Sequence, residues 1–307
     1  MKKITGLILS TAFIIPHATN ADSVIERLSL NSSIGYLTGK AQEFVYVEDY
    51  QLSQLDWDIK GSAVIKGEGN FKLLSWLDAN AQGWITLAAG NAVMDDYDWL
   101  NPMQEQWTDW SHHDNTSLNQ ANKIDFSLRA WLPSENNTHF AGIIGYQRNL
   151  FSFLAKGGCY NYQNGNITGC FPAGEKSLGY KQTFSAPYLG LAGNYVRNAF
   201  EFNSVFKYGP DVDAKDTDQH YLRNLTYQDN SQDSEFYNVT LNLGYYIKPQ
   251  VKLFAEGELN YFPNSKGDML VRDNDSGEII YFPNGTSGLS NRSYVVSLGL
   301  QYTGANL

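Results

Sequence analysis

Apolar and polar side chains alternate along most of this chain with a period of two residues. In the segment 238–247 the odd-numbered positions from Val239 to Ile247 are apolar, whereas the even-numbered positions from Asn238 to Gly244 are small or polar. Successive side chains of a β-strand point to opposite faces, so this period predicts strands, and no segment has the period of a helix. The same alternation recurs in 124–132 and 251–262, and it starts again near Leu28, Glu43, Ala63, Leu77, Phe140, Tyr188, Phe200 and Tyr294.

The polar face of these strands carries ionisable groups, for example Lys252, Glu256 and Glu258 in one segment and Asp125 and Arg129 in another. A charged face turned toward a lumen, with the apolar face turned toward lipid, accounts for that pattern. Strands of about 9–11 residues are long enough to cross a bilayer, and a closed barrel leaves no unpaired backbone in lipid. We therefore expect an all-β fold, an antiparallel transmembrane β-barrel of about ten strands, the even number that is usual in bacterial barrels.

The connections between the expected strands are unequal in length. Short turns such as Lys248–Gln250 alternate with four long polar segments, at 92–122, 156–180, 209–235 and 263–292. Short turns on one side and long loops on the other are typical of outer-membrane barrels, so we expect these segments to be long extracellular loops. No linker, repeat or low-complexity tract divides the chain, which indicates a single domain.

The first residues predict export. Two lysines precede the apolar run Ile4–Ile15, and small residues lead to an acceptable signal-peptidase site after Ala21. A membrane anchor is the alternative, but this run falls short of the roughly 20 apolar residues that a spanning helix needs. We therefore expect a signal peptide at 1–21 and a β-barrel domain at 22–307.

Composition agrees with an exported barrel and limits its partners. The chain has 20 Tyr, 16 Phe and 7 Trp, an enrichment that suits the aromatic girdles of a membrane barrel. Its formal charge is −10, which disfavours nucleic acid and suits basic partners. The only two cysteines, Cys159 and Cys170, flank an Asn/Gly-rich turn, and in an exported protein this arrangement favours a disulfide across the base of a loop.

Two acidic motifs lie in the long polar segments. Asp96 and Asp98, like Asp218 and His220, are two residues apart, so in a strand each pair shares a face. Neighbouring carboxylates repel, which favours a retained proton, and Asp218 can orient the His220 imidazole as a general base. Taken alone, acidic runs are more often solvated surface. The sequence has no EF-hand spacing, HExxH motif or GxSxG elbow, so it indicates neither a metal nor a serine nucleophile.

Several separated blocks, in order, resemble the omptins, which are outer-membrane aspartyl proteases of Gram-negative bacteria with a ten-stranded barrel. The similarity runs from the first strand to about Tyr302. The blocks are Ser53-Gln54-Leu55-Asp56-Trp57, Asp96-Tyr97-Asp98-Trp99, Trp107-Thr108-Asp109-Trp110-Ser111, Gly145-Tyr146-Gln147, Ala155-Lys156-Gly157-Gly158, Gly179-Tyr180-Lys181-Gln182 and Asp218-Gln219-His220-Tyr221.

The resemblance implies a catalytic role for four residues. Asp218 and His220 match the Asp-His dyad of the family, with His220 as general base. Asp96 and Asp98 match the Asp couple that faces the dyad and helps to hold the attacking water. Water would then be the nucleophile, and no metal or other cofactor is required.

The resemblance also implies cleavage between basic residues. Glu43 and Asp216 match the two acids at the bottom of the family's S1 pocket, where they would pair with an arginine or a lysine. Asp109 matches an acid on the S1′ side. Met94 and Leu178 fall where apolar residues line S1.

The lipopolysaccharide site of the family is largely changed. Tyr146 is kept, but Arg148 stands where a Glu is usual, and Leu150 and Thr183 stand where arginines are usual. Gln232 stands where a Lys is usual. Omptins generally need lipopolysaccharide for activity, so phosphate recognition is expected to be weakened or rebuilt in this chain.

The sequence therefore predicts an endopeptidase in the bacterial outer membrane, with its active site on the extracellular side. Its substrates would be basic host proteins or cationic peptides, cut at basic or dibasic sites. The alternative is a catalytically silent barrel that serves as an adhesin or structural anchor. A diffusion pore is disfavoured, because side chains largely fill the lumen of a ten-stranded barrel.

Overall fold

The computed structural model describes residues 27–134 and 137–304, and its regular elements are all β-strands. No helix in these ranges is long and apolar enough to cross a membrane. The expected signal peptide, 1–21, lies outside the described residues. The strands are β1 (Leu28–Val47), β2 (Tyr50–Leu74), β3 (Leu77–Thr86), β4 (Gly90–Asp98), β5 (Asp109–Trp131), β6 (Thr138–Lys156), β7 (Cys159–Tyr162), β8 (Ile167–Cys170), β9 (Lys176–Arg197), β10 (Phe200–His220), β11 (Leu225–Lys248), β12 (Val251–Asp273) and β13 (Ile279–Thr303).

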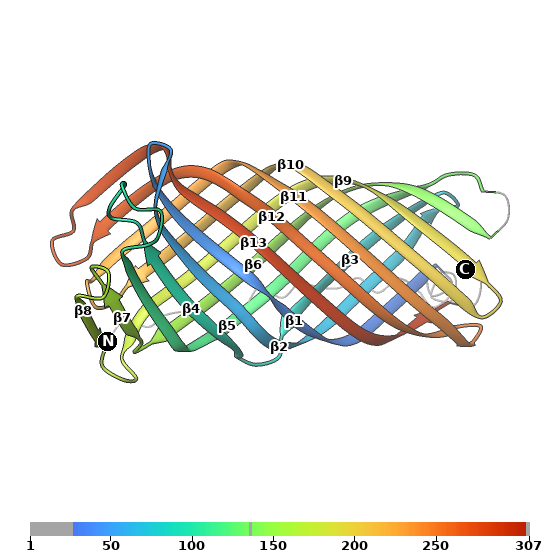
Figure 1. Cartoon of the computed structure of the whole chain (residues 1–307). Helices are drawn as coiled ribbons and strands as arrows, with labels where there is room; N and C mark the ends of the chain where they lie inside the picture. The colour runs from blue at the N-terminus through green and yellow to red at the C-terminus, as the bar shows by residue number, and fades with distance from the viewer. Residues whose placement is uncertain (1–26, 135–136, 305–307) are drawn as a thin grey trace, which may run out of the picture.

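The strands close into a ring. Strand β1 pairs with both β2 and β13, and sequential antiparallel pairing continues around to β5. Strands β3 and β4 follow one another along a single position in the ring, because both pair with β2 and β5. The hairpin β7–β8 attaches to the outer end of β5. The ring thus has ten antiparallel positions, which confirms the predicted barrel (Figure 1).

The strands are longer than predicted. Apart from β3 and β4, the ring strands run from 19 residues in β6 to 25 in β2 and β13. Most of the expected loop 209–235 is strand, because β10 continues to His220 and β11 begins at Leu225. Beyond the bilayer the outer face also meets water, so the hydrophobic alternation that marks a strand disappears there although the hydrogen-bonded ladder continues.

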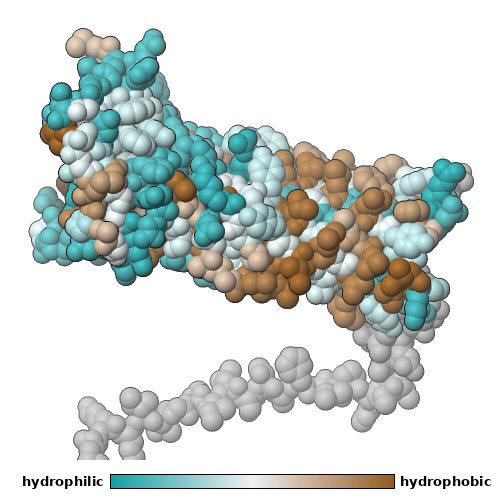
Figure 2. Space-filling model, turned by 60° about the horizontal axis from the view of Figure 1, so that its bottom comes forward, coloured by the Kyte–Doolittle hydropathy of each residue, from teal (hydrophilic) through white to brown (hydrophobic). Residues whose placement is uncertain are grey.

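An apolar band surrounds one part of the barrel. Figure 2 shows hydrophobic side chains gathered toward one end of the molecule, while the other end is predominantly hydrophilic. The outward side chains that contribute include Leu30, Ile34, Leu189, Leu191 and Leu298, which are between 49 % and 69 % exposed. Such a band on the outer wall is the surface that a lipid bilayer covers.

The lumen within this band is filled by paired charges. Lys123 bonds to Glu258, and Lys66 bonds to the other oxygen of Glu258 at 2.8 Å. Lys207 bonds to Asp125 in the same buried layer. Buried charges need such partners, and the packing confirms the expected polar, occupied lumen.

The two ends of the barrel differ. At the apolar end, two-residue turns join β2 to β3, β9 to β10 and β11 to β12. At the polar end lie the turns β1–β2, β10–β11 and β12–β13, the connection β4–β5, and the hairpin β7–β8 (Figure 1). The strand extensions at this polar end carry the two acidic motifs.

Candidate active site

The last residues of β10 hold an aspartate and a histidine side by side. Asp218 is buried and His220 is half-buried, and His220 Nε2 lies 2.6 Å from Asp218 Oδ2. The Arg223 guanidinium bonds to the other ring nitrogen, Nδ1. Because a guanidinium can only donate, Nδ1 must accept, and the ring proton is on Nε2 and points to Asp218. In this tautomer Nδ1 carries the lone pair that can accept a proton.

The inner face of β4 carries two half-buried carboxylates. Asp96 and Asp98 have the same orientation in the strand, and the Ser53 hydroxyl donates to Asp96 at 3.5 Å. Burial and the nearby Asp98 carboxylate raise the pKa of Asp96 well above its usual value. Burial also raises the pKa of Asp98. The two groups therefore retain a proton under conditions in which exposed aspartates are fully ionised.

The couple and the dyad face one another across the inside of the barrel. Strands β4 and β10 lie on different sides of the ring, separated by β5, β6 and β9. The charges of Asp96 and Asp218 nevertheless interact, as do those of Asp98 and His220. The inner wall at the polar end thus has a carboxyl pair on one side and an imidazole on the other, and we call the space between them the cleft.

A cluster of three buried acids lies beside the dyad. One carboxylate oxygen each from Glu43, Asp216 and Asp229 lies within 4.8 Å of the other two. The three side chains come from β1, β10 and β11 and are 2 %, 5 % and 2 % exposed. Burial is the main cause that raises the pKa of all three, to about 8 for Asp216, and repulsion from nearby acids, Asp218 among them, acts in the same direction. The cluster is a strongly negative pocket once it loses its protons.

Aromatic rings form a floor beneath these acids. Trp57 stacks on Tyr180 with ring centroids 5.2 Å apart and planes 7° apart, and Trp57 also packs against Phe153. Met94 and Leu178 belong to the same buried apolar cluster. Burial, followed by the charges of Asp216 and Glu43, raises the pKa of the Tyr180 hydroxyl. The predicted apolar residues therefore lie next to the predicted acids.

Asp109 begins β5 near the Asp couple, with which its charge interacts. Its carboxylate accepts a hydrogen bond of 3.2 Å from the backbone N–H of Gln163, in the turn of the hairpin β7–β8. Tyr162 of that hairpin is also near the couple. Burial, and after it the charges of Asp96 and Asp98, raise its pKa to about 12. The hairpin thus forms part of the cleft.

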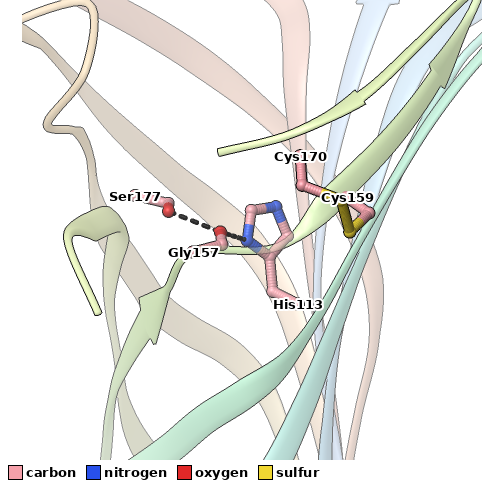
Figure 3. Close-up of a disulfide and its surroundings, with 5 residues drawn as sticks. All are labelled: His113, Gly157, Cys159, Cys170 and Ser177. Carbon is pink, nitrogen blue, oxygen red and sulfur yellow. Dashed lines mark hydrogen bonds between the residues drawn. A yellow bond between two sulfur atoms is a disulfide. The ribbon is translucent and has the colours of Figure 1, made fainter. Parts of the chain in front are cut away.

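A disulfide joins the two strands of this hairpin, Cys159 to Cys170, which confirms the predicted bond (Figure 3). Next to it, His113 Nδ1 and the Ser177 hydroxyl both donate to the carbonyl oxygen of Gly157, each at 2.6 Å. A side chain at Gly158 would lie 2.3 Å from the imidazole, so only glycine fits. His113 is buried beside the hairpin, stacks on Phe171 and thereby supports it.

The residues expected to contact lipid lie elsewhere. Tyr146 is 45 % exposed on the outer wall of β6, and Arg148 and Leu150 have the same orientation in that strand. Thr183 of β9 is the direct neighbour of Leu150. Gln232 belongs to β11, but its side chain lies outside the described part of the chain. This patch is separate from the cleft.

Sequence analysis missed Arg223, Asp229 and Tyr162. Arg223 stands in the short turn between β10 and β11, and its contact with His220 depends on how that turn folds. Asp229 lies in a segment that was expected to be a loop. Its N–H donates to Asp216 at 3.2 Å, a contact set by strand register, which the spacing of residues in one segment does not reveal.

A closed barrel with an outer apolar band and a polar cleft at one end defines the class of outer-membrane barrel proteins. The family model of the omptins matches residues 24–303, and the chain belongs to the omptin family. It is 40 % identical to a plasminogen activator of Yersinia pestis over 98 % of this chain and 99 % of that protein. It is 38 % identical to the outer membrane protease OmpP of Escherichia coli, covering 91 % and 90 %.

A solved structure agrees with these relatives. The crystal structure of the outer membrane protease OmpT from Escherichia coli superposes with a TM-score of 0.87 at 36 % identity, covering 91 % of this chain and 97 % of that one. This protein is accordingly an outer-membrane β-barrel protease, and these relatives favour that function over the alternative of a silent barrel.

Proposed function

We propose that this protease is an aspartyl-type endopeptidase that cuts at basic or dibasic sites, with its cleft on the extracellular side. Water is the nucleophile, activated by His220 and Asp218 opposite Asp96 and Asp98. The observation that carries the proposal is the arrangement of the two pairs, whose charges interact across one cleft. Both pairs lie on the strand ends at the polar end of the barrel, away from the apolar band.

His220 acts as the general base in this mechanism. Its Nδ1 lone pair takes a proton from water, and Asp218 stabilises the imidazolium through the Nε2–H bond at 2.6 Å. Arg223 bonds to the same Nδ1. Its guanidinium must therefore leave this nitrogen before water can be deprotonated there, which is possible because the Arg223 side chain is exposed.

The Asp couple provides both a donor and an acceptor. Because burial and repulsion keep a proton on Asp96 or Asp98, one carboxyl group can donate to the carbonyl oxygen of the scissile peptide. The ionised partner can accept a hydrogen bond from the attacking water. Attack then gives a tetrahedral intermediate without a covalent enzyme intermediate, and the mechanism requires no metal.

The substrate preference follows from the charge of the pocket walls. Glu43 and Asp216 would pair with the side chain before the scissile bond, above the floor that Met94 and Leu178 help to form. Asp109 lies near Asp98 and would pair with the side chain that follows the scissile bond. Desolvated carboxylates form strong charge-assisted hydrogen bonds with a cation, so basic proteins and peptides are the proposed substrates.

A lipid activator is a separate part of the proposal. The outer wall at Tyr146 keeps one family residue, while Arg148, Leu150 and Thr183 differ from the usual set. We expect lipopolysaccharide to activate the enzyme less than is usual for omptins, because fewer cations remain in the usual places for its phosphates.

A peptide library cleaved with and without lipopolysaccharide tests these points together. The refolded protein should cut only where a basic residue precedes the scissile bond, and most rapidly where another follows. Its rate without lipopolysaccharide should remain measurable. Cleavage at neutral or acidic sites at equal rates would contradict the specificity, and a rate of zero without lipopolysaccharide would contradict the weakened lipid dependence.

A further inference from the structure

Asp229 is a buried acid for which the mechanism above has no use. It is 2 % exposed, and neither of its carboxylate oxygens accepts a hydrogen bond of good geometry within the protein; the nearby Ser287 hydroxyl, which opposes the rise in its pKa that burial causes, donates its bond to the Asp268 carbonyl. Glu43 Oε2 and Asp216 Oδ2 are also buried without partners. Leaving a buried carboxylate oxygen unsatisfied costs free energy, so four such atoms in one place point to a ligand that satisfies them.

The spacing of these oxygens limits what the ligand can be. One oxygen from each of the three acids lies within 4.8 Å of the other two. An ammonium nitrogen donates three hydrogen bonds in tetrahedral directions, so its three acceptors, each about 2.8 Å from nitrogen, lie about 4.6 Å apart. The three oxygens lie within 4.8 Å of one another, which leaves room for an ammonium nitrogen between them.

A guanidinium fits three convergent oxygens less well. It is planar and bonds best side-on to one or two carboxylates through pairs of parallel N–H groups. Three oxygens placed around its edges would be roughly 6 Å apart, because the donors extend outward from the central carbon. Two carboxylates can accept the paired N–H groups of an arginine. A third carboxylate adds an acceptor for the third N–H of a lysine ammonium.

We propose that Asp229 is a specificity-determining residue that completes a three-carboxylate site for the ammonium of a lysine side chain at the position before the scissile bond. This inference rests on the proposed function, since it refines the same pocket. Asp229 contributes through its orientation on β11: its own N–H holds Asp216 at 3.2 Å, and its carboxylate points into the shared space. The aromatic floor of Trp57 and Tyr180 would pack against the methylene stem of that lysine.

The test compares two peptides that differ only in lysine or arginine before the scissile bond, with a chelator present so that divalent cations do not occupy the acids. Wild-type protein should cleave both, with kcat/KM values within about threefold. In Asp229→Asn, kcat/KM for the lysine peptide should fall about tenfold or more relative to the arginine peptide, because a charged partner is lost. Asp229→Ser should give the same change.

The matched control is Asp213→Asn. Asp213 lies on the same strand as Asp216 but on the outer face, where it pairs with Lys215 at 2.7 Å, and its variant should leave the lysine-to-arginine ratio unchanged. Heat-modifiable migration in gels reports that each variant is folded. An unchanged ratio in folded Asp229→Asn would overturn the inference and leave the proposed function intact. Failure of the wild type to cleave either peptide would overturn both.

Discussion

The buried Asp216 carboxyl group lowers the stability of the folded protein at neutral pH. Burial raises its pKa to about 8, whereas an exposed aspartate titrates near pH 4. Between these values the folded protein keeps a proton that the unfolded chain has released, so the free energy of unfolding decreases as pH rises from about 4 to about 8. The acids that would bind a cationic substrate therefore destabilise the empty barrel at neutral pH.

Asp216→Asn should remove this cost. We expect its apparent melting temperature in detergent to exceed that of the wild type at pH 8, by an amount on the order of several degrees. The difference should largely vanish at about pH 3, where this aspartate is mostly protonated in both the folded and the unfolded wild type. Asp213→Asn on the outer face serves as control, since an exposed ion pair contributes little. A gain of equal size at both pH values would contradict the account.

Only part of the site is accessible to reasoning from residue spacing. Residues two apart share a face of a strand, so Asp96 with Asp98 and Asp218 with His220 could be paired from the sequence. That the two pairs lie near one another, and that Asp229 joins Glu43, depends on which strands meet across the barrel. The resemblance to the omptins implied that the Asp couple faces the Asp-His dyad. It did not imply that Asp229 lies beside Glu43.

The hairpin β7–β8 positions one edge of the cleft. Its disulfide joins Cys159 of β7 to Cys170 of β8. In its turn, the backbone N–H of Gln163 donates to the Asp109 carboxylate at 3.2 Å. The hairpin pairs in the ladder only with the end of β5, and its turn adds bonds such as that from the Asn164 N–H to the Thr108 carbonyl at 2.8 Å, so it lies outside the ring of ten positions.

Replacing both Cys159 and Cys170 by serine should therefore loosen the cleft and not the barrel. We expect kcat/KM for a dibasic peptide to fall several-fold, while heat-modifiable migration stays as in the wild type. Loss of a disulfide that closes a short loop removes about 3 kcal/mol of constraint, and in this case that loss is confined to the hairpin. Wild-type activity in the double variant would show that the hairpin does not hold Asp109 or Tyr162 in a productive position.

Strand existence was more predictable than strand length. Within the apolar band the outer face of each strand is apolar and the inner face is polar. Apolar and polar residues therefore alternate in 238–247. Farther along the same strand, residues such as Asp229 and Asn230 are polar on either face, and the pattern no longer distinguishes strand from loop. The separate strands expected near Leu28 and Glu43 proved to be one, β1.

At the scale of the whole molecule, the apolar band and the polar extension make the two ends of the barrel different, so the barrel has a defined orientation in the membrane. The band (Figure 2) indicates which part lies in lipid, and the dyad and the Asp couple belong to the strand ends at the opposite, hydrophilic part. If the polar end faces outward, intact cells that carry the protein should cleave a basic protein too large to cross the outer membrane. The rate should not rise when the cells are lysed, whereas cleavage that appears only after lysis would place the cleft on the inner side.

The central claim is that His220 activates water with the help of Asp218. It is tested most directly by the rate at which His220→Ala cleaves an Arg-Arg peptide. His112→Ala is a matched control, because His112 pairs with Asp95 at 2.8 Å on the outer wall, an Asp–His contact outside the cleft. We predict that folded His220→Ala loses at least about 10²-fold in kcat, while His112→Ala cleaves at the wild-type rate. A folded His220→Ala that keeps the wild-type rate would contradict the account.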